Sequence, residues 1–204
     1  MTNEASGLRP ARERIVGAAM DAFMELGYGQ TSTLEIATRA QVSKREIYAL
    51  FGSKQAILAA CVTDRAQRMR LPPEFPIART RDELAEVLVK LGATLLQEIC
   101  APAVLGVFRL AIAEAQVASE VAQTLNIARQ SVRSAVREVF VQAQTTRLLE
   151  EGDPDEVAAE FLSILWGDLQ VSLLLKLRDA PGPAEAKRRA QHATKVVFQL
   201  YTTS

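Results

Sequence analysis

Two cationic residues, Lys44 and Arg45, stand side by side at the start of a short predicted helix, and Tyr48 follows one turn later. Residues four apart share one face of a helix. An arginine can donate two hydrogen bonds to the O6 and N7 atoms of a guanine, so we predict that Lys44 and Arg45 contact base edges. The Tyr48 hydroxyl is placed to reach a phosphate.

Hydroxyl groups and one more lysine surround this cationic face. Thr31, Ser32 and Thr33 precede one predicted helix, and Lys54 begins another. Free backbone N–H groups and the positive end of the dipole favour phosphate at a helix N-terminus. We therefore predict phosphate contacts from six residues: Thr31, Ser32, Thr33, Ser43, Tyr48 and Lys54.

The residues needed for most catalytic chemistry are scarce in this chain. His192 is the single histidine, and the two cysteines, Cys61 and Cys100, are far apart in apolar helical patterns. A zinc site or a catalytic triad needs more such groups, and both cysteines are typical of buried thiols. We therefore expect no enzyme activity, no catalytic residues, no metal site and no cofactor.

The cationic face needs a scaffold of short helices. Ser32 with Glu35, and Ser43 with Glu46, have the spacing of capping boxes, which predicts helices at 33–40 and 44–51. A longer helix begins at Arg9 after a loose tail over 1–8, and a fourth helix runs from Ser53 to about Met69. Two short helices joined by a tight turn form a helix-turn-helix, whose second helix enters the major groove.

Three prolines between residues 71 and 76 end the fourth helix and predict a domain boundary. We predict a DNA-binding domain over 9–70 and a second helical domain over 80–204. Apolar residues recur with helical spacing in the second domain, which predicts five further helices: 81–99, 102–118, 120–149, 154–178 and 184–201. The fold class is therefore all-α.

Charge and hydropathy bear on partners and location. The chain of 204 residues carries 24 basic and 24 acidic side chains, so its net charge is zero. Residues 1–70 hold 10 basic and 7 acidic residues, a mild excess of positive charge at the N-terminus. We see no secretion signal and no apolar run long enough to span a membrane, so we expect a cytoplasmic protein without a membrane partner.

Residues 11–60 resemble the DNA-binding domain of the TetR family of transcriptional regulators. The matching strings are GYGQTSTLEIA at 27–37 and AQVSKREIYALFGSKQAIL at 40–58. The resemblance covers about a quarter of the chain and implies phosphate contacts from Thr31, Tyr48 and Lys54 and base contacts near Lys44 and Arg45.

Three positions depart from the family pattern. Gln41 replaces a turn glycine, so it must tolerate a left-handed or strained backbone. Arg45 replaces a glycine on the reading helix and adds a long cation there. Leu50 stands where a histidine or tyrosine often contacts phosphate, so we expect that contact to be missing.

The region after residue 80 resembles the family's ligand-binding and dimerisation domain more weakly, through RLAIAEA at 109–115 and AAEFLSILWG at 158–167. The resemblance implies a homodimer formed by the helices at 154–178 and 184–201, and a pocket for a small, largely apolar effector. The candidate pocket residues equally suit ordinary core packing: Leu88, Leu95, Phe108, Gln116, Phe140, Trp166 and Gln170.

These observations lead to one functional hypothesis. We expect a ligand-responsive repressor that binds a palindromic operator in double-stranded DNA as a homodimer and is released by its effector. The alternatives are a transcriptional activator of the same fold, a helical adaptor that does not bind DNA, and an enzyme acting on a small apolar molecule.

Overall fold

The computed structural model describes residues 4–67, 75–114, 119–150 and 152–201. Those residues form ten α-helices and no strand, which confirms the all-α class. The helices are α1 (Glu4–Leu26), α2 (Thr33–Ala40), α3 (Lys44–Phe51), α4 (Lys54–Gln67), α5 (Arg81–Ile99), α6 (Pro102–Glu114), α7 (Ser119–Thr145), α8 (Pro154–Trp166), α9 (Leu169–Leu174) and α10 (Pro183–Tyr201).

The chain divides into two compact units. The first unit holds Met1–Arg68 and Gly106–Ala128, and the second holds Met69–Leu105 and Arg129–Ser204. Helices α6 and α7 thus contribute residues to both. The described residues of 106–114 and 119–128 thus group with the first unit, and the predicted domains over 9–70 and 80–204 stay a prediction.

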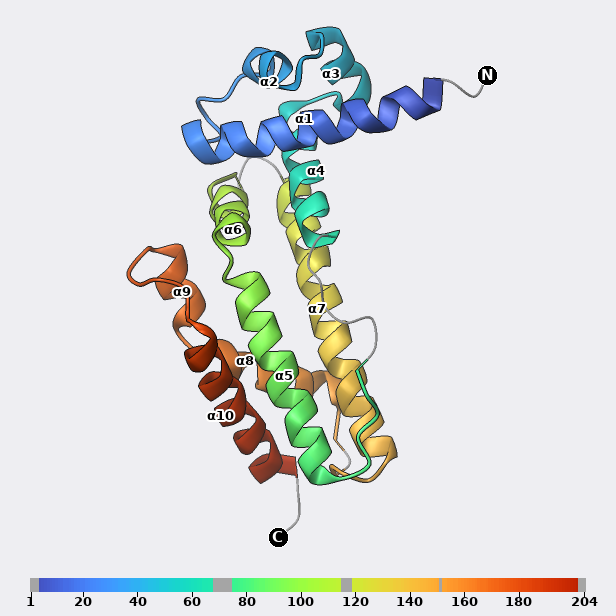
Figure 1. Cartoon of the computed structure of the whole chain (residues 1–204), viewed down its shortest axis with the longest axis vertical. Coiled ribbons are helices and arrows are strands. Elements are labelled where there is room, and N and C mark those ends of the chain that lie inside the picture. Colours follow the sequence, from blue (N-terminus) through green and yellow to red (C-terminus); the bar gives the residue numbers. More distant parts are fainter. Residues whose placement is uncertain (1–3, 68–74, 115–118, 151, 202–204) are drawn as a thin grey trace. The chain divides into compact units, whose positions relative to one another are not determined.

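In the first unit, α2 and α3 lie together against α1 (Figure 1). Their buried faces meet in one apolar core, in which Ile36, Ala37 and Ile47 are at most 3% exposed. Val42 and Phe51 pack against this core while remaining partly exposed. The two short helices bury only a few side chains each, so their placement depends on α1 and α4.

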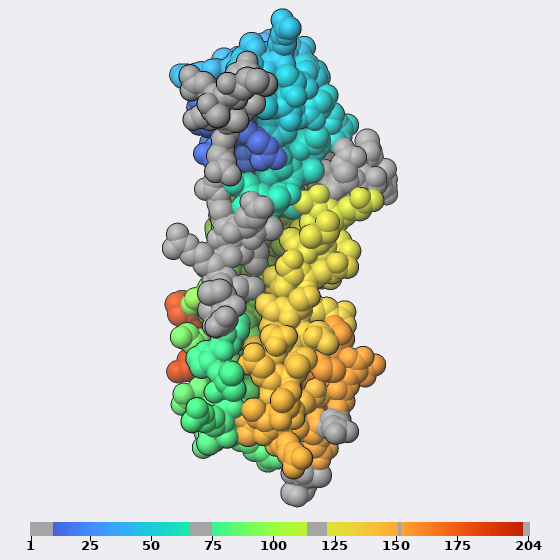
Figure 2. Space-filling view, turned by 90° about the vertical axis from the view of Figure 1, so that its right-hand side faces the viewer, coloured from blue at the N-terminus to red at the C-terminus, as the bar shows by residue number. Residues whose placement is uncertain are grey.

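In the second unit, α5 lies between α10 and the C-terminal half of α7, and α8 also packs against α10 (Figure 1). Figure 2 shows the α7 segment, coloured yellow to orange, beside the green α5. Phe140 of α7 and Phe161 of α8 meet edge to face, with 5.8 Å between ring centroids. Such a contact adds to the stability gained by burying both rings.

Three predicted boundaries were wrong. Helix α1 begins at Glu4, so most of the expected tail is helical and Pro10 lies inside the helix. The helix expected over 154–178 breaks at Gly167, where φ is 48° and the α8 C-terminus is capped. The helix expected to reach Leu149 ends at Thr145, because Arg147 takes a left-handed conformation with φ 58°.

Within the described segments, none of the helices is by itself long and apolar enough to cross a membrane. The α5 helix and the following 102–113 stretch are long and apolar enough only when taken together, and they are bent relative to each other.

Candidate nucleic-acid interface

The N-terminus of α3 is fixed by a complete capping box. The Ser43 hydroxyl oxygen accepts from the Glu46 backbone N–H at 3.1 Å, and the Glu46 carboxylate accepts from the Ser43 N–H at 2.8 Å. These hydrogen bonds from Ser43 lower the pKa of Glu46 below its ordinary value. Because both ends of the cap are engaged, the first turn of α3 is held rigidly.

That first turn presents Lys44 and Arg45, which are both exposed. The Arg45 side chain has no hydrogen bond or ion pair among the described residues, so its guanidinium is available to a partner. The Lys44 ammonium lies 5.8 Å from the Tyr48 ring centroid, and Tyr48 is 48% exposed. Lys44, Arg45 and Tyr48 thus lie on the exposed part of α3.

Hydroxyl groups from the start of α2 lie close to this face. The Thr33 and Tyr48 hydroxyl oxygens are 3.5 Å apart, although they come from different helices. Ser32 caps α2 by accepting from the Glu35 N–H at 3.0 Å, which leaves its own hydroxyl proton free to donate. One hydroxyl of the Thr33 and Tyr48 pair donates to the other, so Ser32 and the accepting hydroxyl of that pair are placed to donate hydrogen bonds to an anion.

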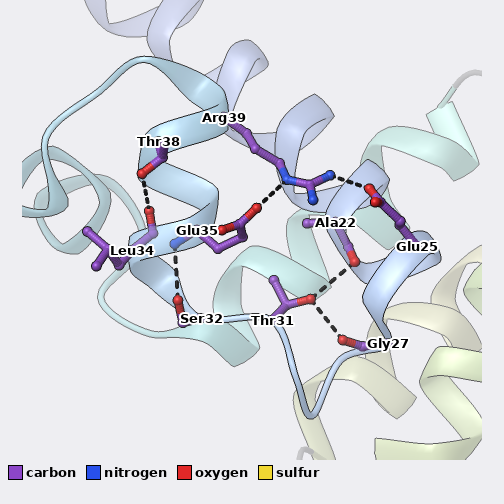
Figure 3. A network of polar contacts seen from close by, with 9 residues as sticks. All are labelled: Ala22, Glu25, Gly27, Thr31, Ser32, Leu34, Glu35, Thr38 and Arg39. Atoms are coloured by element: carbon purple, nitrogen blue, oxygen red, sulfur yellow. Dashed lines mark hydrogen bonds and ion pairs between the residues drawn. The ribbon is translucent and has the colours of Figure 1, made fainter.

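Thr31 has a structural position, contrary to the predicted phosphate contact. Its side chain is 1% exposed, and its hydroxyl donates to the carbonyl oxygens of Ala22 at 3.1 Å and Gly27 at 2.8 Å (Figure 3). A hydroxyl has a single proton, so Thr31 cannot reach a phosphate without breaking these contacts. It closes the connection between α1 and α2.

The half-buried Lys54 side chain contacts the connection between α1 and α2. Its ammonium donates to the carbonyl oxygens of Tyr28 at 2.8 Å and Thr31 at 3.0 Å. The same nitrogen lies 4.2 Å from the centroid of the Tyr28 ring. Two of the three N–H donors of Lys54 are thus engaged within the protein, and the phosphate contact stays a prediction.

The turn between α2 and α3 confirms what the sequence indicated at Gln41. Gln41 is left-handed, with φ 55° and ψ 48°, and the following Val42 N–H donates to the Ala37 carbonyl at 3.1 Å. Leu50 is half-buried against the core of the first unit, and its hydrocarbon side chain has no polar group for a partner.

Three arginines support the short helices through contacts that were not predicted from the sequence. Arg39 pairs with Glu25 of α1 at 2.6 Å and with Glu35 of its own helix at 2.7 Å (Figure 3), and both carboxylates raise the pKa of Arg39. This pairing draws Glu35 away from Ser32, so the predicted capping box there is only half formed.

The other two arginines come from α1. Arg14 donates from Nε to the Ala40 carbonyl at 3.2 Å, at the C-terminal end of α2. Arg12 lies over the Phe51 ring of α3, 5.3 Å from its centroid. The spacing of Glu35 and Arg39 is a signal that the sequence carries, whereas the partners of Arg12 and Arg14 depend on tertiary packing.

The residues predicted to line an effector pocket belong to both units, and the pocket stays a prediction. Leu88, Leu95 and Phe140 are fully buried in the core of the second unit. Trp166 and Gln170 are half-buried there, Phe108 belongs to the first unit, and Gln116 lies outside the described residues.

Two hollows within the second unit exclude all of those residues from their walls. A cavity of about 10 Å³ between α5 and α7 is too small for an effector. An open groove of about 1240 Å³ runs between α5 and α10, and Val89, Lys90, Lys187 and Phe198 are among its lining residues.

The helices of the first unit form a helix-turn-helix module of the kind found in transcriptional regulators. Residues 15–61 match the family of bacterial regulatory proteins described as tetR, and residues 86–203 match the C-terminal domain of AefR-like transcriptional repressors. The second match covers more than half of the chain. The protein therefore belongs to the TetR family of transcriptional regulators, which are not enzymes.

Individual relatives agree with this placement. The chain is 26% identical over 160 residues to the uncharacterized HTH-type transcriptional regulator YvkB of Bacillus subtilis (strain 168), covering 78% of this chain and 82% of YvkB. A TetR transcriptional regulator from Agrobacterium tumefaciens has a similar fold, with a TM-score of 0.83, 24% identity and 96% coverage of both chains. The flavonoid-responsive regulator FrrA has a TM-score of 0.78 at 23% identity, covering 94% of this chain and 97% of FrrA.

Proposed function

We propose that this protein is a ligand-responsive repressor that binds a palindromic DNA operator as a homodimer. The observation that carries the proposal is the first turn of α3, where exposed Lys44 and Arg45 stand beside exposed Tyr48. In a helix-turn-helix the N-terminal residues of the second helix face the base edges in the major groove. Arg45, which has no partner among the described residues, donates to a guanine.

Phosphate contacts come from the hydroxyl groups that remain available: Ser32, Thr33, Ser43 and Tyr48. They set the register of α3 in the groove, while Lys44 and Arg45 select the sequence. A palindrome with half-sites spaced by about 34–36 Å, or slightly more, lets both reading helices of a dimer enter successive major grooves.

Exposed apolar side chains support dimerisation through the C-terminal helices. Val171, Leu175 and Leu177, at and just after α9, are 60%, 64% and 72% exposed, and Leu200 of α10 is 57% exposed. Val171, Leu175 and Leu177 lie close together in the chain, and a group of large exposed apolar residues is typical of a surface that another chain covers. A second copy of this chain is the partner we propose.

Release by a small, largely apolar effector completes the proposal. The match of residues 86–203 to the C-terminal domain of AefR-like repressors supports both repression and an effector domain. The effector acts by binding more tightly to a dimer whose reading helices are wrongly spaced.

Selection of duplexes from a random pool tests the proposal. The selected duplex should be a palindrome, and sedimentation of the complex should give two protein chains per duplex. Template carrying this palindrome at a promoter should then give less transcript when the protein is added. More transcript would favour the activator alternative, and failure to enrich any sequence would contradict the proposed function.

A further inference from the structure

The connection between α1 and α2, residues 27–32, is closed by polar contacts from two directions. From within, the buried Thr31 hydroxyl donates to the Ala22 and Gly27 carbonyl oxygens. From α4, the Lys54 ammonium donates to the Tyr28 and Thr31 carbonyl oxygens at 2.8 and 3.0 Å. We call this group of Tyr28, Thr31 and Lys54 the loop clamp.

The Lys54 ammonium is enclosed on three sides by the clamp. Two sides are carbonyl oxygens, and the third is the face of the Tyr28 ring, 4.2 Å from the nitrogen. The Tyr28 ring in turn packs against Phe23 of α1, with 5.2 Å between centroids. Two carbonyl dipoles and an aromatic face together stabilise the positive charge of the ammonium, so a phosphate is not needed for this purpose.

The loop clamp connects α4 to the segment that leads into the reading helix, α3. Lys54 is the first residue of α4, and the loop that it grips leads directly into Ser32 and α2. The α2 and α3 helices are short and follow one another through a tight turn. A shift of the α4 N-terminus therefore displaces the start of α2, and this displacement changes the position of α3.

We propose that Lys54 is a positioning residue, which fastens α4 to the α1–α2 loop and thereby sets the placement of α3 for operator binding, without touching phosphate itself. This inference rests on the proposed function, since it concerns the DNA that α3 reads. It assigns to Lys54 a role distinct from the phosphate contact that its position at a helix N-terminus first indicated.

Salt dependence of DNA binding separates the two roles. Each phosphate contact contributes about 0.9 to the slope of log affinity against log salt concentration. We expect Lys54→Met to bind the selected palindrome about tenfold or more weakly, with an unchanged slope and unchanged affinity for unrelated duplex. A slope reduced by about 0.9, with equal weakening on all sequences, would overturn the proposal.

Two matched variants calibrate this readout. Thr31→Val removes the other half of the clamp without changing charge or shape, so it should reproduce the pattern of Lys54→Met. Lys54→Arg retains the charge but not the geometry of the two bonds, so it should fail to restore affinity; full restoration would overturn the proposal.

Amide hydrogen exchange in the free protein tests the clamp independently of DNA. The Thr31 N–H is bonded to the Gly27 and Tyr28 carbonyl oxygens. In Lys54→Met, residues 27–35 should exchange about tenfold faster, while α10 exchanges at the wild-type rate. Unchanged exchange over 27–35 would overturn the clamp. If the wild-type protein selects no duplex, the proposed function fails and these exchange rates decide the clamp alone.

Discussion

Replacing Gly92 by alanine should destabilise the second unit. Gly92 is buried on α5, and an added Cβ would lie 2.9 Å from the Ala190 Cβ of α10, 3.2 Å from Leu165 Cδ1 and 3.3 Å from Phe161 Cζ. Carbon atoms pack best at about 3.5–4.0 Å, so α5 and α10 would have to separate by roughly 0.6 Å or more. Overpacking of this kind costs about 1–3 kcal/mol.

Helix propensity acts in the opposite direction and must be removed from the comparison. Alanine favours a helix over glycine by about 1 kcal/mol. Gly17 of α1 supplies the control, because it is exposed and an added Cβ there would meet nothing within 4 Å. Gly17→Ala should stabilise by up to about 1 kcal/mol, and the difference between the two variants should therefore be about 1–3 kcal/mol.

Urea unfolding followed by circular dichroism measures both changes, each against the wild-type transition of the unit that carries the substitution. The double variant Gly92→Ala/Ala190→Gly restores the space between α5 and α10, so the two substitutions should couple favourably. If Gly92→Ala stabilised as much as Gly17→Ala, and the double variant showed no coupling, the close contact of α5 with α10 would be refuted.

Two further predictions concern the turn and the thiols. Gln41→Gly should stabilise the first unit by up to about 1 kcal/mol, because glycine adopts the φ of 55° without strain; a lower urea midpoint would contradict this. Burial raises the pKa of Cys61 to about 12 and of Cys100 to about 11. Neither thiol of the folded protein should therefore react with a disulfide reagent at pH 8, and rapid labelling would be inconsistent with their burial. In the unfolded chain the thiols ionise from about pH 9, while in the folded protein they stay protonated, so the free energy of unfolding should fall as the pH rises above 9. This fall should be less steep in Cys61→Ala. Equal slopes of unfolding free energy against pH, measured by urea titration of both proteins, would oppose this.

Local signals in the sequence were sufficient for most of the first unit. The Ser43 and Glu46 pair defined the start of α3, and Gln41 in place of a glycine correctly indicated a left-handed turn. Both depend on hydrogen bonds or backbone angles within a few residues. The expected cationic face at Lys44 and Arg45 follows directly from that local geometry.

Residues whose partners are far away in the chain could not be placed in this way. Thr31 bonds to a carbonyl nine residues away, and Lys54 bonds to carbonyls 23 and 26 residues away, so their types alone suggested phosphate instead. The predicted pocket residues could not be assigned to a pocket for a related reason. Leu88, Leu95 and Phe140 have the same apolar pattern whether they line a cavity or fill a core, and the structure places them in the core.

The central claim is that the first turn of α3 reads duplex DNA, and Arg45 tests it most directly. The measurement is the anisotropy-determined affinity of wild type and Arg45→Ala for the selected palindrome and each of its single-base-pair variants at fixed salt. We predict that Arg45→Ala loses about 1–3 kcal/mol on the palindrome and no longer discriminates at one position of each half-site. An unchanged discrimination profile at every position would contradict the account.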